Sequence, residues 1–457
     1  MTSLLAKTAL LPEGWAENVL ISMDEDGIIT GVHPGKEKNS KGAEYIDGVV
    51  LPGMPNVHSH SFQRAMSGLT ERAMGKKDNF WSWRETMYRF LEKIGPEEME
   101  AIAAQLYVEM LKSGYTSVGE FHYIHHQQDG TPYENREELS EHIIQAALKV
   151  GIGITHMPVL YAYSGFGKAD PGVGQKRFLN NVDALFCIIK SLRKKYKNNP
   201  LVRIGFAYHS LRAVSPEMMI EADKLIQEID KTMPIHIHVA EQKEEVDNCV
   251  KWSGKRPVEW LLENTSVNKN WCIVHATHMT GDETAALAKT GAVIGICPTT
   301  EGNLGDGIFP MQAYWEHKGK FAIGSDSHIS VSPIEELRWL EYMQRLKHRK
   351  RTIVHKDNLP SVGASLYESA LSGGAQALGQ NISALEIGHR ADLIVLDEEH
   401  PSLYGRMRDH ILDAFIFAGN NNPVKDVMVA GKWVVRDQVH FKEKEVLKRY
   451  KNTIKQL

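Results

Sequence analysis

The stretch VVLPGMPNVHSH, residues Val49 to His60, joins an apolar strand-like run to a histidine pair. In an extended segment, residues i and i+2 point the same way, so His58 and His60 can bind one ion from the same side. At the carboxyl end of a barrel strand, such a pair would face the mouth where active sites are built. On this pair alone, a metal site and two surface histidines are equally acceptable interpretations.

The same alternation of apolar runs and helical stretches continues through the chain. Continuous apolar strands that alternate with helices indicate a parallel sheet covered on both faces. Eight such units predict a metal-dependent (β/α)₈ TIM-type barrel, although counting alone does not exclude a doubly wound open sheet. The predicted strands are 49–57, 117–121, 152–160, 202–208, 234–239, 271–276, 292–297 and 321–325. The helical stretches include 96–113, 135–150, 178–196, 216–231 and 281–290.

Shorter strand-like segments occupy the two ends of the chain. They are 18–23, 28–32, 391–396, 414–417, 424–429 and 432–435, and Ala430–Gly431 fits a hairpin turn between the last two. We therefore predict that residues 1–50 and 377–457 form one small β-sandwich domain beside a catalytic barrel of residues 51–376. Residues 441–457 are expected to form a charged terminal helix.

Composition and charge exclude several classes of protein. Of 457 residues, 42% are hydrophobic and 24% charged, which argues against disorder. Lys plus Arg number 53 and Asp plus Glu 57, a formal charge of −4, so nothing favours nucleic acid or a membrane surface as a partner. No apolar run approaches the roughly 18 residues of a membrane span. With four cysteines and no secretory signal pattern, we predict a cytoplasmic protein without a disulfide framework.

Three later predicted strands end at or near further residues whose side chains can bind a metal. His238 lies near the end of the fifth strand with Glu241 just beyond it, His275 ends the sixth, and Asp326 follows the eighth. His236 lies deeper on the face of His238, and we interpret it as a hydrogen-bonded core histidine. Imidazole and carboxylate ligands suit zinc or another borderline divalent metal, which activates water when a coordination position stays open. The set of strand ends therefore predicts one catalytic metal.

Other catalytic signatures are missing from the sequence. It contains no GxxxxGK[ST] phosphate loop and no GxGxxG after a strand. It also contains no GxSxG nucleophile elbow. The histidine and aspartate series is the one coherent set of chemical groups in the sequence.

With these motifs the chain resembles the amidohydrolase superfamily, whose members share a metal-bearing barrel and a β-sandwich made from both chain ends. The run GHRADLIVLD, residues 388–397, resembles the superfamily's return strand into that sandwich. Binuclear members usually carry a carboxylated lysine at the end of strand four, where this chain has Tyr208, His209 and Ser210. The resemblance is therefore to the mononuclear deaminase branch.

Within that branch the chain is most similar to the formimidoylglutamate deiminase family of histidine degradation. The matching segments are LPGMPNVHSHSFQRAM at 51–66, GEFHYIHH at 119–126, HSLRAV at 209–214, HVAEQ at 238–242 and HATH at 275–278. The resemblance covers the whole chain. It implies hydrolysis of N-formimino-L-glutamate, a small dicarboxylate, to N-formyl-L-glutamate and ammonia, and it implies a homodimer.

The resemblance also implies roles for individual residues. Glu241 would protonate the imine nitrogen, and either His275 or Asp326 would take the proton of the attacking water. One divalent metal, with zinc favoured over iron or manganese, would be held by His58, His60, His238 and Asp326. The glutamate part of the substrate would be bound by Gln63, Arg84, Tyr123, His209 and Arg212.

Two arginines suit a substrate with two carboxylates, because arginine binds carboxylate bidentately. Arg212 follows the fourth strand, and Arg84 lies in the long segment after the first strand, which could cover the site as a lid. Without the resemblance, the simpler interpretation of both arginines is that they are solvated or in surface ion pairs, and Trp81 and Trp83 could be a packing patch.

Two other functions remain open. One is a deaminase of the same branch that acts on an aminated purine, pyrimidine or triazine, whose flat ring needs aromatic stacking and amide hydrogen bonds rather than two arginines. The other is a non-enzymatic scaffold that has lost its metal, which predicts missing ligands. All four expected ligands are present in this sequence.

Overall fold

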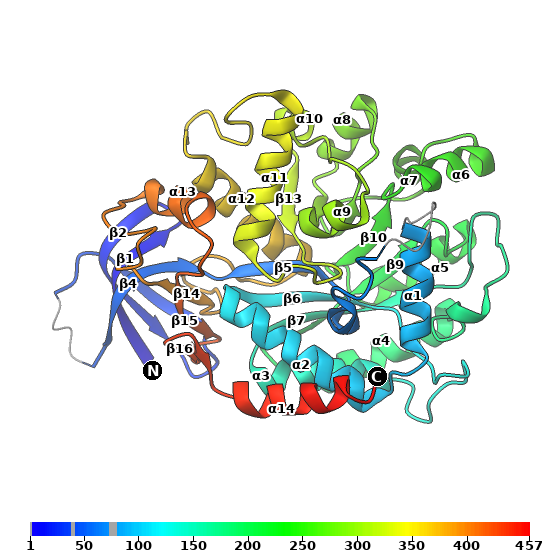
Figure 1. The fold of residues 1–457 in the computed structure, drawn as a ribbon, viewed down its shortest axis with the longest axis horizontal. Helices are drawn as coiled ribbons and strands as arrows, with labels where there is room; N and C mark the ends of the chain where they lie inside the picture. Colours follow the sequence, from blue (N-terminus) through cyan, green and yellow to red (C-terminus); the bar gives the residue numbers. More distant parts are fainter. Residues whose placement is uncertain (1, 38–41, 73–79) are drawn as a thin grey trace.

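The structure, a computed structural model, describes residues 2–37, 42–72 and 80–457. Two sheets organise these residues (Figure 1). Parallel strands surrounded by helices form one part of the molecule, and a second sheet built from both ends of the chain lies beside it. The two parts are joined where β4 (Glu44–Pro52) continues through Gly53 into β5 (Met54–Ser59).

The larger sheet is a barrel. Each hydrogen-bonded neighbour pair in it is parallel, and an isolated parallel bridge between Ser59 and Asp326 links the first strand to the last. This arrangement confirms the predicted (β/α)₈ barrel. A short extra strand, β8 (Val202–Ile204), pairs with β7. The barrel strands are β5, β6 (Tyr115–His122), β7 (Gly153–Leu160), β9 (Phe206–Ser210), β10 (Ile235–Val239), β11 (Trp271–His275), β12 (Val293–Ile296) and β13 (Lys320–Ile323).

Helices follow the strands, and several of them begin at a polar side-chain cap. Ser215 caps α5, with its Oγ accepting from the Met218 amide, and Pro216 occupies the first helical position. Between β5 and α2 lie the 3₁₀ helix η1 (Ser61–Met66) and helix α1 (Phe80–Leu91). The remaining barrel helices are α2 (Pro96–Ser113), α3 (Glu138–Val150), α4 (Val182–Tyr196), α5 (Pro216–Ile229), α6 (Lys243–Ser253), α7 (Pro257–Asn264), α8 (Gly281–Lys289), α9 (Pro298–Leu304), α10 (Met311–Glu316), α11 (Pro333–His348) and α12 (Val362–Leu378).

The last turn of α12 closes the amino-terminal end of the barrel, which we call the barrel floor. Ala377 and Leu378 pack there with Val57 and Cys272 from the strands. The helix approaches β13 so closely that a Cβ on Gly373 would lie 2.0 Å from the Phe321 carbonyl oxygen. Glycine is required at this position because any side chain would collide with the backbone.

The second sheet has eight strands in the order β17-β16-β15-β14-β4-β1-β2-β3. Antiparallel pairing of β14 with β4 joins the two chain ends, as predicted. Neighbouring residues of β4 pack into two different hydrophobic cores. Val50 belongs to the core of the second sheet, whereas Val49 and Leu51 belong to the core of the barrel. The strands besides β4 are β1 (Thr2–Leu11), β2 (Gly14–Met23), β3 (Ile29–His33), β14 (Leu393–Leu396), β15 (Val424–Val429), β16 (Lys432–Arg436) and β17 (Val439–His440).

Two details differ from the sequence-based expectation. The predicted strand 49–57 is divided at Gly53 between the two sheets, which supports the boundary that we propose near residue 50. The predicted strand at 414–417 is wrong, because these residues end helix α13 (Asp409–Phe417). Four apolar residues are too few to separate strand from helix by periodicity. The buried residues of α13 include Ile411, Leu412, Phe415 and Ile416, which fits one helical face.

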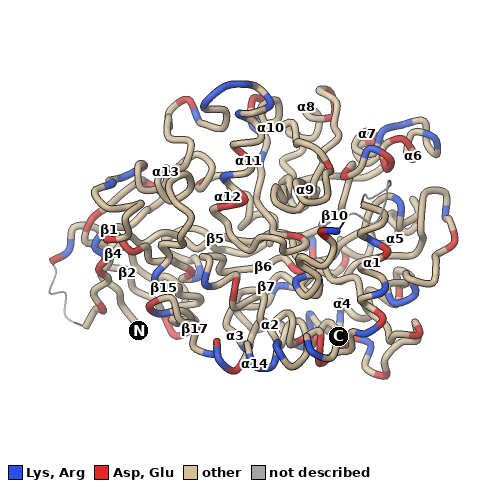
Figure 2. Tube along the Cα trace, in the orientation of Figure 1, with Lys and Arg blue, Asp and Glu red and all other residues tan. Residues whose placement is uncertain are grey.

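The predicted terminal helix is present as α14 (Glu443–Ile454), which lies along α2 (Figure 1). Lys112 on α2 bonds Glu443 at 2.8 Å. Acidic and basic residues are interspersed over the outer helices (Figure 2), in keeping with the near-neutral net charge. Among the described residues, no helix combines the length and apolar character needed to cross a membrane.

Candidate active site

Three barrel strands end in strained backbone at the mouth. Ala240, His275 and Asp326 have φ of 52°, 68° and 47°, in the left-handed region that non-glycine residues avoid. Each such conformation costs on the order of 1–2 kcal/mol. Strain of this kind persists where the surrounding structure enforces it, most often at functional sites.

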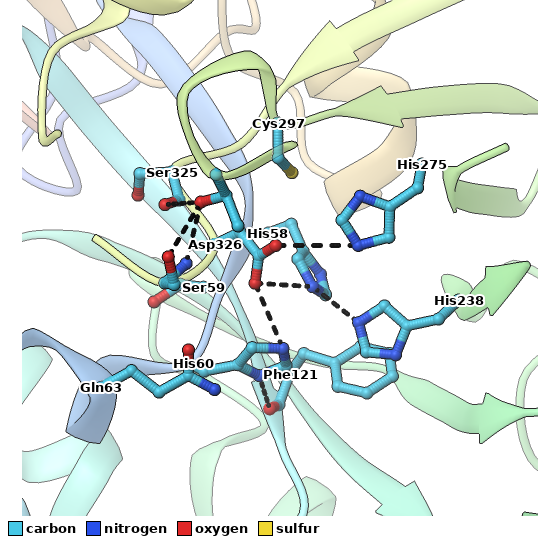
Figure 3. Close-up of polar contacts among 12 residues, drawn as sticks. His58, Ser59, His60, Gln63, Phe121, His238, His275, Cys297, Ser325 and Asp326 are labelled. Atoms are coloured by element: carbon cyan, nitrogen blue, oxygen red, sulfur yellow. Dashed lines mark hydrogen bonds and ion pairs between the residues drawn. The ribbon is translucent and has the colours of Figure 1, made fainter. Parts of the chain in front are cut away.

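Three imidazoles converge at the mouth (Figure 3). His58 Nε2 lies 2.9 Å from His238 Nε2. The Nδ1 of His60 lies 3.0 Å from the Phe121 carbonyl oxygen and that of His238 lies 2.9 Å from the His209 carbonyl oxygen. A carbonyl can only accept, so both rings carry the proton on Nδ1 and leave the Nε2 lone pair free, as in metal-binding histidines.

Burial keeps these imidazoles neutral. It lowers the pKa of His60 to about 3, and it places the pKa of both His58 and His238 well below the usual range, helped by the neighbouring histidines. Neutral imidazole is the form that binds a metal.

Asp326 adds a carboxylate to the three rings. Its Oδ1 lies 3.4 Å from His60 Nε2 and 3.7 Å from His58 Nε2, and its amide donates to the His58 carbonyl oxygen at 3.0 Å. Burial raises the Asp326 pKa to about 7. One ligand atom each from His58, His60 and Asp326 lie within 4.8 Å of one another, and the same holds for His58, His238 and His275. These donors fit a divalent cation.

His275 lies behind the ligands, among three acids. Its Nε2 is 3.6 Å from Asp326 Oδ2 and 3.8 Å from Glu241 Oε1, while its Nδ1 is 3.2 Å from Glu301 Oε1. Burial lowers the His275 pKa, but Glu241, Glu301 and Asp326 together outweigh burial and raise it to about 10. Burial also raises the pKa of Glu241. The three acids thus favour the protonated form of His275, and the site also holds an acid, Glu241, that can carry a proton.

Two guanidiniums without carboxylate partners face the same cavity. Among the described residues, no carboxylate lies within 4.0 Å of Arg84 or Arg212, and the Nε of each lacks a hydrogen-bond partner. Arg212 is only 7% exposed. Their Cζ atoms lie 4.5 Å and 5.7 Å from the centre of the Trp81 ring, which provides cation–π contacts.

Polar groups complete the cavity beside the arginines. Gln63 on η1 donates to the Tyr123 hydroxyl at 3.2 Å, and its own Oε1 has no partner in the described structure. His209 lies close by, and burial together with Arg212 keeps its pKa well below the usual range. The structure therefore brings the predicted site residues together. His58 lies beneath the cavity, and the lining includes His60, Gln63, Arg84, Tyr123, His209, Arg212, His238, Glu241, His275 and Asp326.

Sequence reasoning missed part of the site. Trp83, which we also considered as packing, lines the cavity, and Glu301 contacts His275. Glu301 comes four residues after Cys297 at the seventh strand, so inspection of every strand end would have found it. The other cavity residues outside the prediction are Phe80, Met87, Tyr88, Tyr161, Phe178, Thr300, Leu304 and Ser327. His236 is a core histidine as predicted, with Nε2 2.8 Å from the Ala377 carbonyl oxygen.

Sequence comparisons place this geometry among known proteins. The profile of the Amidohydrolase family matches residues 49–434, and that of "Formimidoylglutamate deiminase HutF, N-terminal domain" matches residues 1–44. The chain is 50% identical over 461 residues to formimidoylglutamate deiminase of Pseudomonas aeruginosa, with all of both chains covered. It is 25% identical to 5'-deoxyadenosine deaminase of Methanopyrus kandleri, over 100% of this chain and 99% of that protein.

Solved structures have the same fold. The crystal structure of an amidohydrolase from Brucella melitensis superposes with a TM-score of 0.94 at 43% identity, covering 100% of this chain and 99% of that one. An adenosine deaminase from Xanthomonas campestris with bound zinc gives a TM-score of 0.81 at 21% identity, with the same coverage. At that identity the second likeness concerns the fold alone.

Proposed function

Because the chain belongs to the amidohydrolase family, and within it to the formimidoylglutamate deiminases, we propose that it hydrolyses N-formimino-L-glutamate. The products are N-formyl-L-glutamate and ammonia, so the enzyme is a hydrolase of an amidine C–N bond in histidine degradation. The observation that carries the proposal is the pair of guanidiniums, Arg84 and Arg212, which line the cavity of the metal-binding group and have no carboxylate partner among the described residues.

The arginines suit the two carboxylates of this substrate. A buried cation is costly unless it is paired, so a guanidinium left unpaired at a cavity wall favours an anionic ligand. Each guanidinium can bind one carboxylate through two parallel hydrogen bonds. The unpartnered Gln63 Oε1 and the hydroxyl of Tyr123 would bind the remaining polar groups of the glutamate part, together with His209.

We propose that the cation is zinc. The proposed donors, His58, His60, His238 and Asp326, supply three nitrogens and one oxygen, which are ligand types that zinc binds. When bound, such a cation supplies Lewis acidity, which lowers the pKa of water toward neutrality. The chain's own residues then orient the substrate and move the protons.

The proton transfers follow from the positions of three side chains. Water attacks the formimino carbon while one of its protons passes to Asp326 Oδ2 or to His275 Nε2, two atoms that lie 3.6 Å apart. Glu241, whose pKa is raised by burial, donates a proton to the imine nitrogen. Loss of the remaining hydroxyl proton forms the formyl C=O as the C–N bond breaks. The nitrogen receives one proton from Glu241 and one from the group that accepted the first water proton, and the remaining hydroxyl proton restores Glu241 as ammonia leaves.

The test is ammonia release from N-formimino-L-glutamate by the zinc-loaded protein, with the second product identified by NMR. We expect one N-formyl-L-glutamate per ammonia. Formamide and glutamate would mean that the other C–N bond is cleaved and would contradict the assignment of the leaving nitrogen.

Arg212→Gln tests the substrate class. We expect kcat/KM to fall about 100- to 1000-fold, the equivalent of about 3–4 kcal/mol from a lost charge-assisted pair. The matched control is Arg203→Gln on the barrel floor, where Arg203 pairs with Asp230 at 2.7 Å, and its kcat/KM should stay unchanged. If zinc-loaded protein is inactive on this substrate but deaminates an aminated heterocycle, the dicarboxylate assignment fails.

The homodimer and the cytoplasmic location remain predictions. The resemblance supports the former, and Trp339, Tyr342 and Leu346 form an exposed apolar stripe on α11 that could take part in it. Sedimentation of the purified protein measures the oligomeric state directly.

A further inference from the structure

A buried carboxylate, Glu301, lies directly behind His275. Glu301 is on α9 and has no exposed surface. Its Oε1 accepts from the Cys297 amide at 2.9 Å and lies 3.2 Å from His275 Nδ1. Its Oε2 has no hydrogen-bond partner in the described part of the chain.

Capping of α9 explains only part of this arrangement. The cap needs one acceptor oxygen, which a neutral amide also provides, whereas a buried carboxylate is costly unless it is paired. Among the described residues, His275 is the one histidine, lysine or arginine whose nitrogen lies within 4.0 Å of a Glu301 oxygen. The carboxylate is therefore placed where its charge acts on His275.

A second buried acid at the same helix start makes a useful contrast. Glu336 on α11 has no exposed surface either, and it accepts from the amide and the hydroxyl of Thr299, at 2.9 and 2.6 Å. No histidine lies within ion-pair distance of Glu336 in the described residues. Burial raises the pKa of Glu336 well above its usual range, and both of its oxygens serve Thr299 at the start of the helix.

We propose that Glu301 is a positioning residue that acts through His275, an inference that rests on the proposed function. By accepting a hydrogen bond from Nδ1–H, Glu301 fixes the orientation of the ring in which Nε2 faces Asp326 and Glu241. The Glu301 carboxylate also lies next to any positive charge that the ring carries during the reaction. A carboxylate that orients a basic histidine in this way stabilises the charge formed during the reaction and does not itself take the proton.

The backbone supports the same role. His275 has a φ of 68°, and its ring is held between Glu301 on one nitrogen and Asp326 with Glu241 on the other. Rotation of the ring by half a turn would direct Nδ1 toward the metal ligands. The hydrogen bond to Glu301 is the described contact that opposes this rotation.

The experiment compares Glu301→Gln with Glu336→Gln in zinc-loaded protein. The amide of Glu301→Gln keeps the cap and the shape but removes the charge. We expect kcat to fall about 10- to 100-fold, as for other carboxylates behind active-site histidines, with KM and bound zinc unchanged. The solvent deuterium effect on kcat should rise, because proton transfer becomes slower. Glu336→Gln should keep kcat within about twofold.

Three results would overturn the proposal. They are an unchanged kcat in Glu301→Gln, an equal loss in Glu336→Gln, and a loss in Glu301→Gln that follows loss of zinc. A second measurement, which needs no substrate, is the tautomer of His275 in the wild-type zinc protein from ¹⁵N chemical shifts, assigned with a His275→Asn variant. A ring with a proton on Nδ1 supports the proposal, and a ring protonated on Nε2 alone refutes it. If the protein is inactive on N-formimino-L-glutamate, the proposed function fails while this measurement still decides the role of Glu301.

Discussion

His236 and His238 lie two residues apart on the same face of β10, and both are almost fully buried. At the barrel floor, His236 Nε2 donates to the Ala377 carbonyl oxygen at 2.8 Å. At the mouth, His238 directs Nε2 at another imidazole nitrogen, His58 Nε2, only 2.9 Å away. Burial and residue type are the same, so the partner distinguishes a structural histidine from a metal ligand.

Charged groups differ between the two ends in the same way. On the floor side, Asp230 pairs with Arg193 at 2.8 Å and with Arg203 at 2.7 Å. At the mouth, Arg84 and Arg212 have no such partner among the described residues. Polar groups bonded within the protein stabilise the barrel, and those without partners at the mouth are available to ligands.

The largest expected effect is at the mouth. His238→Ala removes one proposed ligand, so bound zinc should fall well below one per chain. Activity should fall by more than about 100-fold, because even residues behind metal ligands contribute up to that factor. His236→Phe should instead retain zinc and lose about 1–3 kcal/mol of unfolding free energy, from the unpaired carbonyl of Ala377. Metal analysis and denaturant unfolding measure both. Zinc loss in His236→Phe would erase the distinction between the two histidines.

A large stability effect is expected on the floor. Gly373→Ala would place a methyl group 2.0 Å from the Phe321 carbonyl oxygen, so α12 must move away from β13. We expect unfolding free energy to fall by at least about 3 kcal/mol, the upper range for overpacked cores. Gly281→Ala is the control, because no atom lies within 4 Å of its added Cβ. If Gly373→Ala is as stable as this control, the close contact between α12 and β13 is not needed for stability.

The smallest effect concerns Asp230. Burial raises its pKa, but the hydrogen bonds from Thr232 and the charges of Arg203 and Arg193 outweigh burial and lower it to about 2, against 3.8 in an unfolded chain. The resulting stability is complete above pH 4 and is lost as the pH falls toward 2. Asp230→Asn should therefore lower unfolding free energy at pH 7 by about 1 kcal/mol, after allowance for solvent screening.

Denaturant unfolding at several pH values checks this expectation. The difference between Asp230→Asn and wild type should shrink between pH 4 and pH 2. Zinc content and kcat/KM should not change, since Asp230 precedes β10 at the floor of the barrel, the end opposite the mouth. A loss of activity in Asp230→Asn would mean that the floor and the mouth are not independent.

The sequence predicted what depends on local periodicity. The strand ends that bear His58, His238, His275 and Asp326 could be found because each follows an apolar run and because parallel strands end on the same side. The four-residue run at 414–417 could not be assigned in this way, because so short an apolar run fits the spacing of a buried strand and of a buried helical turn equally well.

The residues that sequence reasoning missed depend on contacts between distant segments. Glu301 matters because α9 turns it toward His275, 26 positions earlier, and Tyr161 and Phe178 reach the cavity from the region after β7. The sequence also could not show that Arg84 and Arg212 have no carboxylate partner among the described residues, because this depends on which side chains lie near them in space. Their cation–π contacts with Trp81 likewise appear only in the structure.

The passage of β4 into β5 through Gly53 also matters for protein engineering. The strand that carries His58 and His60 begins directly after a strand that pairs with β1 and β14 in the other sheet. A barrel excised at Gly53 would start with a free chain end five residues before the first of these histidines. The small sheet is therefore not an exchangeable module, and a chimera between relatives needs its crossover outside β4 and β5.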